Sequence, residues 1–232
     1  MRESWLITPG RVPYGPAFAE MRSLAARRVA GEVPDTLILL EHPPVYTAGR
    51  RTRPEHLLVT ESEIRRRGAE LHQVDRGGSL TFHGPGQLVG YAIVHLGVGP
   101  AIAEHVWRLQ EVVIRTAREV GVELGRAEEV GVWSGDRKVC AIGVKATHRV
   151  TYHGFGLNCS TDRTWFDAIV PCGLADRGVS SLTEEAGRPI EVADALPLAG
   201  RAFEEVFATN LVPAPEKVAG RFVSSDPALA AG

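Results

Sequence analysis

Short apolar segments separated by glycine- and proline-rich turns occupy most of the chain. Residues 36–40, 45–48 and 80–83 have the composition of buried or half-buried strands and are too short for helices of ordinary length. In contrast, residues 102–120 and 192–207 repeat apolar side chains at helical spacing. Runs of strands interrupted by a few helices predict an α+β fold, in which helices pack on a mixed, largely antiparallel sheet.

The remaining elements follow the same two patterns. Residues 18–29 carry a helical apolar stripe, and Thr60 with Glu63 form a capping box at the start of a short helix. Glycine-rich turns lead us to expect hairpin pairing between successive strands along residues 71–96. Further strands are expected at residues 5–8, 71–75, 88–96, 130–133, 138–144 and 151–157.

The chain has no internal repeat and no low-complexity linker. We therefore expect one domain over residues 1–210, followed by a flexible tail over the small, alanine- and proline-bearing residues 211–232. No apolar run reaches the roughly 18 residues of a membrane-spanning helix, and residues 1–10 lack the pattern of a secretion signal. A cytoplasmic protein is the expectation that follows.

The charge balance argues against whole classes of partner. The chain has 232 residues, with 26 Lys+Arg against 28 Asp+Glu and a formal net charge of -2. It has no electrostatic reason to bind nucleic acid or an anionic membrane in general. Recognition must therefore depend on local groups of residues.

The three cysteines, Cys140, Cys159 and Cys172, are odd in number and widely spaced, which argues against a disulfide framework and against a Cys-x-x-Cys site. Cys172 differs from the others because Pro171 and Gly173 enclose it outside any periodic segment, which is typical of a loop. Its thiol is either a nucleophile, which needs a nearby cation or base, or a small buried apolar group. Cys140 and Cys159 belong to predicted strands and suit the second role.

Residues 76–87 contain the densest group of chemically useful side chains. The run Arg-Gly-Gly-Ser-Leu-Thr-Phe-His-Gly-Pro-Gly-Gln combines four glycines, which allow backbone to approach a ligand closely, with several hydrogen-bonding side chains. The same glycines would also suit a pair of tight turns that bind nothing. A second glycine-rich stretch, residues 151–158, includes His153, which either orients a ligand or caps a turn.

Lysine is rare in this chain. Only Lys138, Lys145 and Lys217 are lysines, and the other 23 of the 26 basic residues are arginine. Lys138 opens a predicted strand, where a lysine is usually a solvated cation. An amine that can lose a proton is nevertheless a different chemical group from arginine, so Lys138 is also a candidate for proton transfer.

The common cofactor motifs are absent: there is no phosphate-binding loop, no G-x-S-x-G elbow, no H-E-x-x-H and no complete G-x-G-x-x-G. We expect no cofactor. We also expect no metal, because His83, His153 and the cysteines show no ligand spacing. The cluster Arg50, Arg51 and Arg53 is either a solvated loop or a surface for an acidic protein.

Several motifs in order give the chain a family resemblance. They are E-H-P-P-V-Y-T-A-G-R at 41–50, R-G-G-x-x-T-F-H-G-P-G-Q at 76–87, K-V-C-A-I-G at 138–143, H-G-F-G-L-N at 153–158 and P-C-G at 171–173. Over residues 37–182 the sequence resembles the lipoyl(octanoyl) transferase family. The resemblance implies a catalytic domain of the biotin and lipoate protein ligase type, which transfers an octanoyl group in the first step of endogenous protein lipoylation.

The resemblance also implies partners and residue roles. The donor would be octanoyl-acyl carrier protein, and the acceptors would be lipoyl domains of 2-oxoacid dehydrogenase E2 subunits and the glycine cleavage H protein. Cys172 would be the nucleophile that carries the acyl group as a thioester, and Lys138 would lower the pKa of Cys172 and shuttle protons. The implied substrate-binding walls are Arg76, Gly77, Gly78, Ser79, Leu80, Thr81, Phe82 and His83, with Ala141, Ile142 and Gly143 and with Gly154, Phe155 and Gly156.

The chemistry agrees with these roles, since exchange between thioesters followed by formation of an amide needs no ATP. Backbone amides around Gly77, Gly78 and Gly143 are candidate donors to the tetrahedral intermediates. Two alternatives stay open at this point. One is an ATP-dependent lipoate or biotin ligase of the same fold, which would not need Cys172, and the other is a binding module that holds an acylated carrier without turnover.

Overall fold

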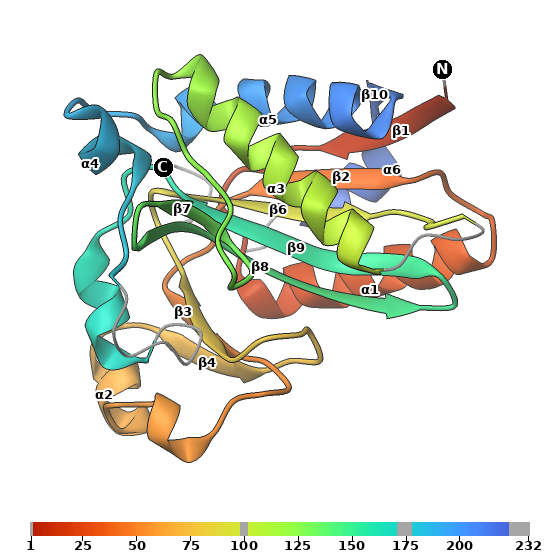
Figure 1. Ribbon diagram of the computed structural model, residues 1–232. Helices are drawn as coiled ribbons and strands as arrows, with labels where there is room; N and C mark the ends of the chain where they lie inside the picture. Colours follow the sequence, from red (N-terminus) through yellow and green to blue (C-terminus); the bar gives the residue numbers. More distant parts are fainter. Residues whose placement is uncertain (1, 98–101, 171–177, 223–232) are drawn as a thin grey trace.

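The computed structural model describes residues 2–97, 102–170 and 178–222, which form strands and helices in the expected mixture (Figure 1). The strands are β1 (Arg2–Ile7), β2 (Thr36–Leu40), β3 (Val45–Ala48), β4 (Glu70–Gln73), β5 (Leu80–His83), β6 (Gln87–Ile93), β7 (Val132–Ser134), β8 (Arg137–Thr147), β9 (Val150–Asn158) and β10 (Thr209–Pro213). The helices are α1 (Tyr14–Val29), α2 (Glu61–Arg66), α3 (Ile102–Glu119), α4 (Leu182–Ala186), α5 (Val192–Phe207) and α6 (Glu216–Ala219). The predicted α+β class is confirmed.

The strands form two sheets. The large sheet has seven strands in the order β10-β1-β2-β6-β9-β8-β7, and the small sheet has three in the order β4-β3-β5. β1 pairs in parallel with β10 and β2, and β3 in parallel with β4, while the other paired strands are antiparallel. The mixed, largely antiparallel pairing therefore agrees with the prediction.

The prediction that successive strands along residues 71–96 pair as hairpins is wrong. β3 lies between β4 and β5, so these two strands do not pair with each other. β6 belongs to the large sheet, where it pairs with β2 and β9. The turn between β5 and β6 therefore joins two sheets instead of closing a hairpin, because both faces of β6 are needed in the centre of the molecule, where all seven of its residues are buried.

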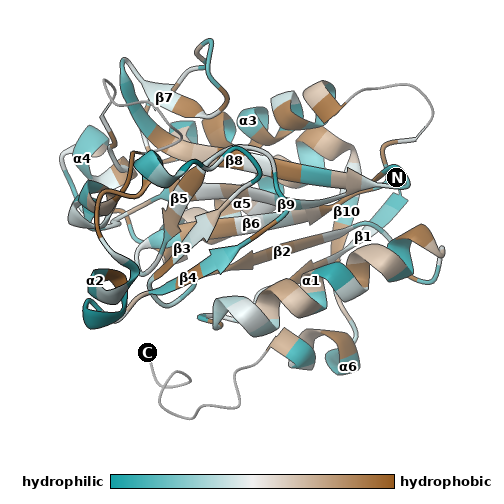
Figure 2. Cartoon of the chain, turned by 90° about the horizontal axis from the view of Figure 1, so that it is seen from below, coloured by the Kyte–Doolittle hydropathy of each residue, from teal (hydrophilic) through white to brown (hydrophobic). Residues whose placement is uncertain are grey.

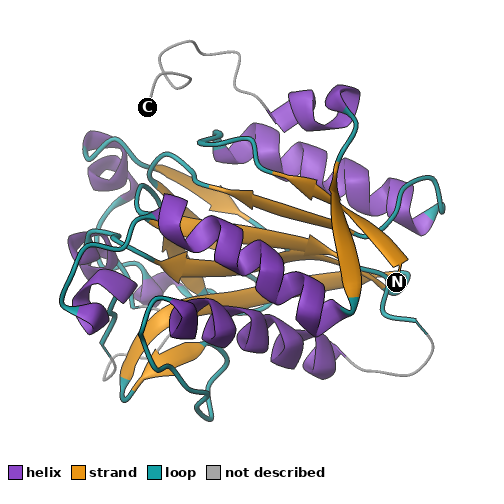
Figure 3. Ribbon diagram, turned by 90° about the horizontal axis from the view of Figure 1, so that it is seen from above, coloured by secondary structure: helices purple, strands orange, loops and turns teal. Residues whose placement is uncertain are grey.

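Helices cover both faces of the large sheet. α3 and α5 lie side by side on one face, as Figures 1 and 3 show, and α1 lies on the other. The apolar stripe predicted for α3 is the reason for its placement, since Leu109, Val113 and Ala117 are fully buried against the sheet and α5. β2 is completely buried between the two layers, and Figure 2 shows its hydrophobic colouring along its length.

The expected flexible tail is ordered over its first part. Residues 211–213 belong to β10, which extends the large sheet, and α6 follows directly. Val218 and Phe222 are buried in the core on the α1 side. The sequence signal was misleading because the apolar residues that anchor this segment are few and widely spaced. Residues 223–232 lie outside the described part of the chain.

The small sheet has its own core, to which α2 contributes Ile64. The predicted capping box of α2 is present, because the Thr60 side chain accepts from the Glu63 amide and the Glu63 carboxylate accepts from the Thr60 amide. Within the ranges that the structure describes, no helix is long and apolar enough to cross a membrane.

Candidate functional site

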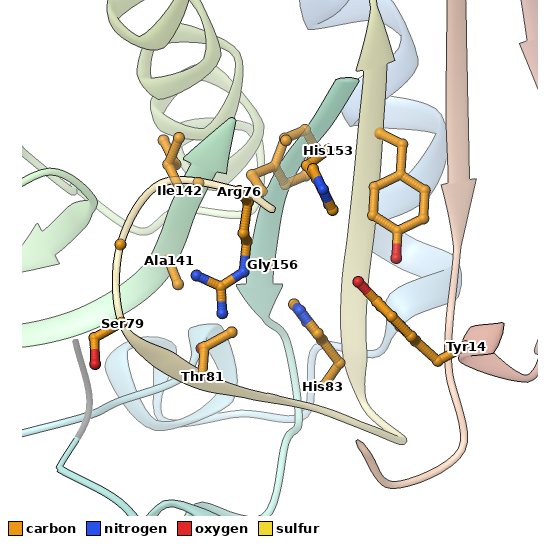
Figure 4. Close-up of a pocket in the computed structure, with 14 residues that line it drawn as sticks. Tyr14, Arg76, Ser79, Thr81, His83, Ala141, Ile142, His153 and Gly156 are labelled. Atoms are coloured by element: carbon orange, nitrogen blue, oxygen red, sulfur yellow. The ribbon is translucent and has the colours of Figure 1, made fainter. Parts of the chain in front are cut away.

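A pocket lies where the small sheet meets the edge of the large one. Its walls are the loop before β5 and β5 itself, the middle of β8 and β9, and the first residue of α1 (Figure 4). It brings together most of the residues that the sequence motifs singled out. The lining residues are Tyr14, Arg76, Gly78, Ser79, Thr81, His83, Tyr91, Ala141, Ile142, Gly143, His153, Gly154, Phe155 and Gly156.

Glycine is required on the β8 and β9 walls because other groups approach their backbone closely. A Cβ at Gly143 would lie 2.9 Å from the carbonyl oxygen of Gly77, and one at Gly156 would lie 2.7 Å from Oε1 of Gln87. Both distances are shorter than a carbon atom tolerates. Gly143 therefore allows the loop before β5 to pack directly on β8, and Gly156 leaves room for the Gln87 side chain.

Arg76 fixes that loop. Its guanidinium donates to the carbonyl oxygen of Thr47 at 2.6 Å and to the Thr47 hydroxyl at 2.8 Å, and its side chain is almost completely buried. Figure 4 shows the side chain crossing the pocket between Ala141 and Thr81. Arg76 thus supplies positive charge inside the pocket as well as holding β3 to the loop.

Three of the residues expected in the walls have other roles. The side chains of Leu80 and Phe82 pack into the core of the small sheet. Gly77 lines a groove next to the pocket. Its amide donates to the carbonyl oxygen of Val144 at 3.0 Å, so this amide is not available to stabilise an intermediate. Alternation along β5 explains the first result, because successive side chains point to opposite faces of a strand.

A buried hydrogen-bond chain leads out of the pocket. His83 Nδ1 lies 2.6 Å from Gln87 Oε1, the Gln87 amide donates to Asn158 Oδ1 at 2.8 Å, and Asn158 Nδ2 donates to the carbonyl oxygen of Ser180 at 2.9 Å. Since Gln87 uses its NH₂ group as donor, its oxygen accepts from a protonated His83 Nδ1. His83 is therefore held as the tautomer with an unprotonated Nε2.

Asp75 organises the other end of the pocket. Its carboxylate accepts from His153 Nε2 at 3.0 Å and from the Tyr152 hydroxyl at 2.6 Å. The hydrogen bond from His153 is the main reason that the pKa of Asp75 lies well below its usual range. His153 has a backbone φ of 61°, a left-handed conformation that directs its ring toward Asp75.

Lys138 lies beside the pocket, at the start of β8, and is almost completely buried. Its ammonium group donates to the carbonyl oxygen of Val130 at 3.3 Å and lies 4.6 Å from the centre of the Trp133 ring. Lys138 shares a small cavity with Thr81, Ala141 and Gly156, which also line the main pocket. The amine is thus next to one end of the main pocket.

The residues on either side of the segment that contains Cys172 are hydrogen-bonded to the backbone of Lys138 and of His56, although Cys172 itself lies outside the described residues. After the segment, the Lys138 amide donates to the Gly178 carbonyl oxygen at 2.9 Å, and the Ser180 amide donates to the Lys138 carbonyl oxygen at 3.0 Å. Before it, the Val170 amide donates to the carbonyl oxygen of His56 at 2.8 Å. Both flanks are therefore fixed by backbone hydrogen bonds.

The other two cysteines are small buried residues of the core, as expected. Cys140 and Cys159 are fully buried in the core beneath α3 and α5. Burial raises the pKa of the Cys159 thiol to about 12, which keeps it protonated and unreactive.

A groove leads from the surface to Lys138. The exposed Arg51 and Arg53 lie along it, together with Ile102, Glu128 and Val130. The Arg51 amide donates to the Gly78 carbonyl oxygen at 3.0 Å and so ties the arginine loop to the pocket wall. In the described residues no group of His, Cys, Asp and Glu is arranged to hold a metal ion.

Sequence reasoning missed four residues of this site: Tyr14, Asp75, Gln87 and Tyr91. Gln87 stood at the end of the 76–87 motif, and Asp75 directly before it, so both carried a weak signal. Tyr14 begins a helix far away in the sequence, and nothing in its neighbours indicates a ligand. Only the packing of α1 against β6 and β9 brings it here.

Comparison with known proteins gives a consistent family. The lipoyl protein ligase A/B catalytic domain matches residues 13–204. A protein of Acidothermus cellulolyticus named octanoyltransferase is 45% identical over 220 residues, which cover 90% of this chain and 96% of that protein. An octanoyltransferase of Rubrobacter xylanophilus is 49% identical over 188 residues, with coverage of 80% and 85%.

Solved structures of similar shape show the fold. The putative lipoate protein ligase of T. acidophilum with bound lipoic acid has a TM-score of 0.73 at 15% identity, over 94% of this chain and 92% of that one. Lipoate-protein ligase A bound with ATP has a TM-score of 0.71 at 16% identity, over 95% and 92%. The expected fold of the lipoate protein ligase type is confirmed.

The buried histidines predict how stability depends on pH. Burial lowers the pKa of His42 to about 4 and of His83 to about 3, so both stay neutral in the folded protein at pH 5. In the unfolded chain they bind protons below about pH 6.5. The unfolded state then holds more protons, so the free energy of unfolding should fall from pH 7 to pH 5, by up to about 1.4 kcal/mol per pH unit for each histidine.

Urea denaturation at half-unit steps of pH measures this slope. Replacing His42 with glutamine should make the slope shallower, whereas the exposed control His148→Gln should leave it unchanged. Equal stability of the wild-type protein at pH 5 and pH 7 would contradict the analysis.

Proposed function

The chain belongs to the lipoyl protein ligase A/B catalytic domain family and is an octanoyltransferase for protein lipoylation, and we propose that it works through a thioester on Cys172. The observation that carries the mechanism is the position of Lys138. Its buried side chain shares a cavity with residues of the pocket wall, and its backbone is hydrogen-bonded to Gly178 and Ser180, which follow Cys172 closely in the chain.

The first half-reaction exchanges one thioester for another. Cys172 attacks the carbonyl carbon of the octanoyl donor as a thiolate, which an ammonium group on Lys138 stabilises. The new bond joins the acyl carbon to the Cys172 sulfur, and the bond to the donor sulfur breaks. The donor leaves as a thiolate and takes up a proton from the Lys138 ammonium group, which becomes a neutral amine.

In the second half-reaction the ε-amine of an acceptor lysine attacks the enzyme thioester. An amide bond forms, the bond between the acyl carbon and the Cys172 sulfur breaks, and the excess proton of the amine passes to a neutral Lys138 amine. The cysteine thiolate and the lysine ammonium are then restored. Because an amide is more stable than a thioester, the reaction runs forward without ATP.

The pocket suits the alkyl chain of this substrate. Ala141, Ile142 and Phe155 give it apolar surface, and each buried methylene contributes about 0.8 kcal/mol. The acceptor class is the lipoyl domain. We propose octanoyl-acyl carrier protein as donor, and 2-oxoacid dehydrogenase E2 subunits and the glycine cleavage H protein as acceptors, in the cytoplasm, where a catalytic thiol stays reduced.

Intact-protein mass spectrometry tests the proposal. Brief incubation with octanoyl-acyl carrier protein and no ATP should add one octanoyl group, which hydroxylamine removes and a lipoyl domain discharges. The adduct should disappear in Cys172→Ser and persist in Cys159→Ser. No adduct in the wild-type protein, with lipoyl-domain modification only when ATP and free octanoic acid are supplied, would assign the chain to the ligases. Stoichiometric binding of the carrier without modification would identify a binding module.

The groove beside the site predicts how an acidic donor protein binds. Exposed Arg51 and Arg53 lie on the route to Lys138 and suit a negatively charged partner. The double variant Arg51→Glu, Arg53→Glu should raise KM for octanoyl-acyl carrier protein at least about fivefold at low salt, and the difference should shrink at high salt because exposed charges are screened.

Two controls accompany this measurement. Activity with octanoyl-pantetheine, which carries no protein surface, should be unchanged in the double variant. Glu128→Lys, on the same groove, should not raise KM for the acidic donor. An unchanged KM after reversal of both arginines, or a KM that does not respond to salt, would refute this docking surface.

A further inference from the structure

We propose that the ring of Tyr14 closes the far end of the acyl pocket and sets the longest chain that the protein accepts. This inference rests on the proposed function, because it takes the pocket to be the site of the acyl chain. The role is that of a specificity-determining residue, supplied by a helix that lies outside all the sequence motifs.

The direction of the chain follows from the position of Lys138. The reacting carbonyl group must lie near this amine, which shares its cavity with Ala141 and Gly156. The alkyl chain then extends from Ala141 along β8 and β9, away from Lys138. Tyr14 and His153 both line the pocket on the side away from Ala141, and Figure 4 shows Tyr14 next to His83.

The distance between these two ends fits a medium-length chain. On the paired strands, Ala141 lies opposite Gly156 and Val144 opposite His153. Three residues of strand at about 3.3 Å each give roughly 10 Å from the reactive end to the level of His153. That length is comparable to an extended octanoyl chain, so additional methylenes would meet the end wall.

Tyr14 differs from the other aromatic residues of the end wall in its hydrogen bonding. Tyr91 lies in the central strand β6, and its hydroxyl is 2.7 Å from His42 Nε2. His153 is held by Asp75. The Tyr14 hydroxyl, in contrast, forms no hydrogen bond with the described residues, although the residue is only 3% exposed.

Packing nevertheless holds the Tyr14 ring firmly across the pocket. Its centre lies 5.2 Å from that of His42, 5.1 Å from that of His72 and 5.8 Å from that of Phe18. The ring also lies nearly parallel to that of His83, with the ring centres 6.4 Å apart, and Figure 4 shows the two side by side. A ring packed among these neighbours cannot swing away to admit a longer chain.

The test compares binding and transfer for acyl chains of 6 to 14 carbons. Binding is measured by calorimetry with free fatty acids, and transfer with the corresponding acyl-acyl carrier proteins. In the wild-type protein we expect affinity to rise up to about 8 carbons and then stop rising. In Tyr14→Ala, the ratio of 12-carbon to 8-carbon affinity should increase at least about tenfold, because each further methylene gains about fourfold when it is buried.

Three further variants make the result decisive. Tyr14→Leu keeps an apolar side chain at this position and should show a smaller shift in the same direction if Tyr14→Ala folds poorly. Tyr14→Phe keeps the ring and should retain the wild-type limit. Leu24→Ala is the matched control and should keep the wild-type limit, because Leu24 is a buried residue of α1 that does not line the pocket.

The same length profile in the wild type, Tyr14→Ala and Tyr14→Leu would overturn the inference, as would a wild-type protein that binds no fatty acid of any length. Fatty-acid binding with the expected shift, but no transfer from any carrier, would count against the proposed function and leave the assignment of Tyr14 intact.

Discussion

Two backbone hydrogen bonds of Lys138 determine the geometry on which the site depends. They pair the first part of β8 with residues 178–180, which directly follow the segment that contains Cys172. Asn158 holds the same residues through the Ser180 carbonyl oxygen. The Lys138 backbone, the Asn158 side chain and residues 178–180 are therefore parts of one hydrogen-bonded unit.

The pocket itself results from close contact between backbones. The loop before β5 comes so near to β8 that only glycine fits at Gly143, and Gln87 comes equally near to Gly156. Arg76 then fixes the loop to β3 with two hydrogen bonds. Charged and polar groups enclose the space together with the apolar residues Ala141, Ile142 and Phe155. Such a wall can hold a thioester carbonyl group at one end and an alkyl chain beyond it.

Much of the fold could be predicted from periodicity alone, because most elements keep a regular apolar pattern over their full length. β2, β3, β5 and α5 have the expected bounds. Strand pairing could not be predicted, since the turn before Gln87 reads like a hairpin but joins two sheets. The ordered residues 211–222 were missed because their anchors, Val218 and Phe222, are isolated apolar residues. In the site, motif residues were found and Tyr14 was not, because its place depends on helix packing.

The central claim is that Lys138 promotes ionisation of the Cys172 thiol, and the pH dependence of Cys172 alkylation tests it directly. Iodoacetamide labelling with peptide mapping reports Cys172 separately from the buried Cys140 and Cys159. The account predicts half-maximal reactivity below the usual thiol value of about 8.5 in the wild-type protein and in Lys138→Arg, with an upward shift of about one unit or more in Lys138→Met. Identical profiles in the wild-type protein and Lys138→Met would contradict it.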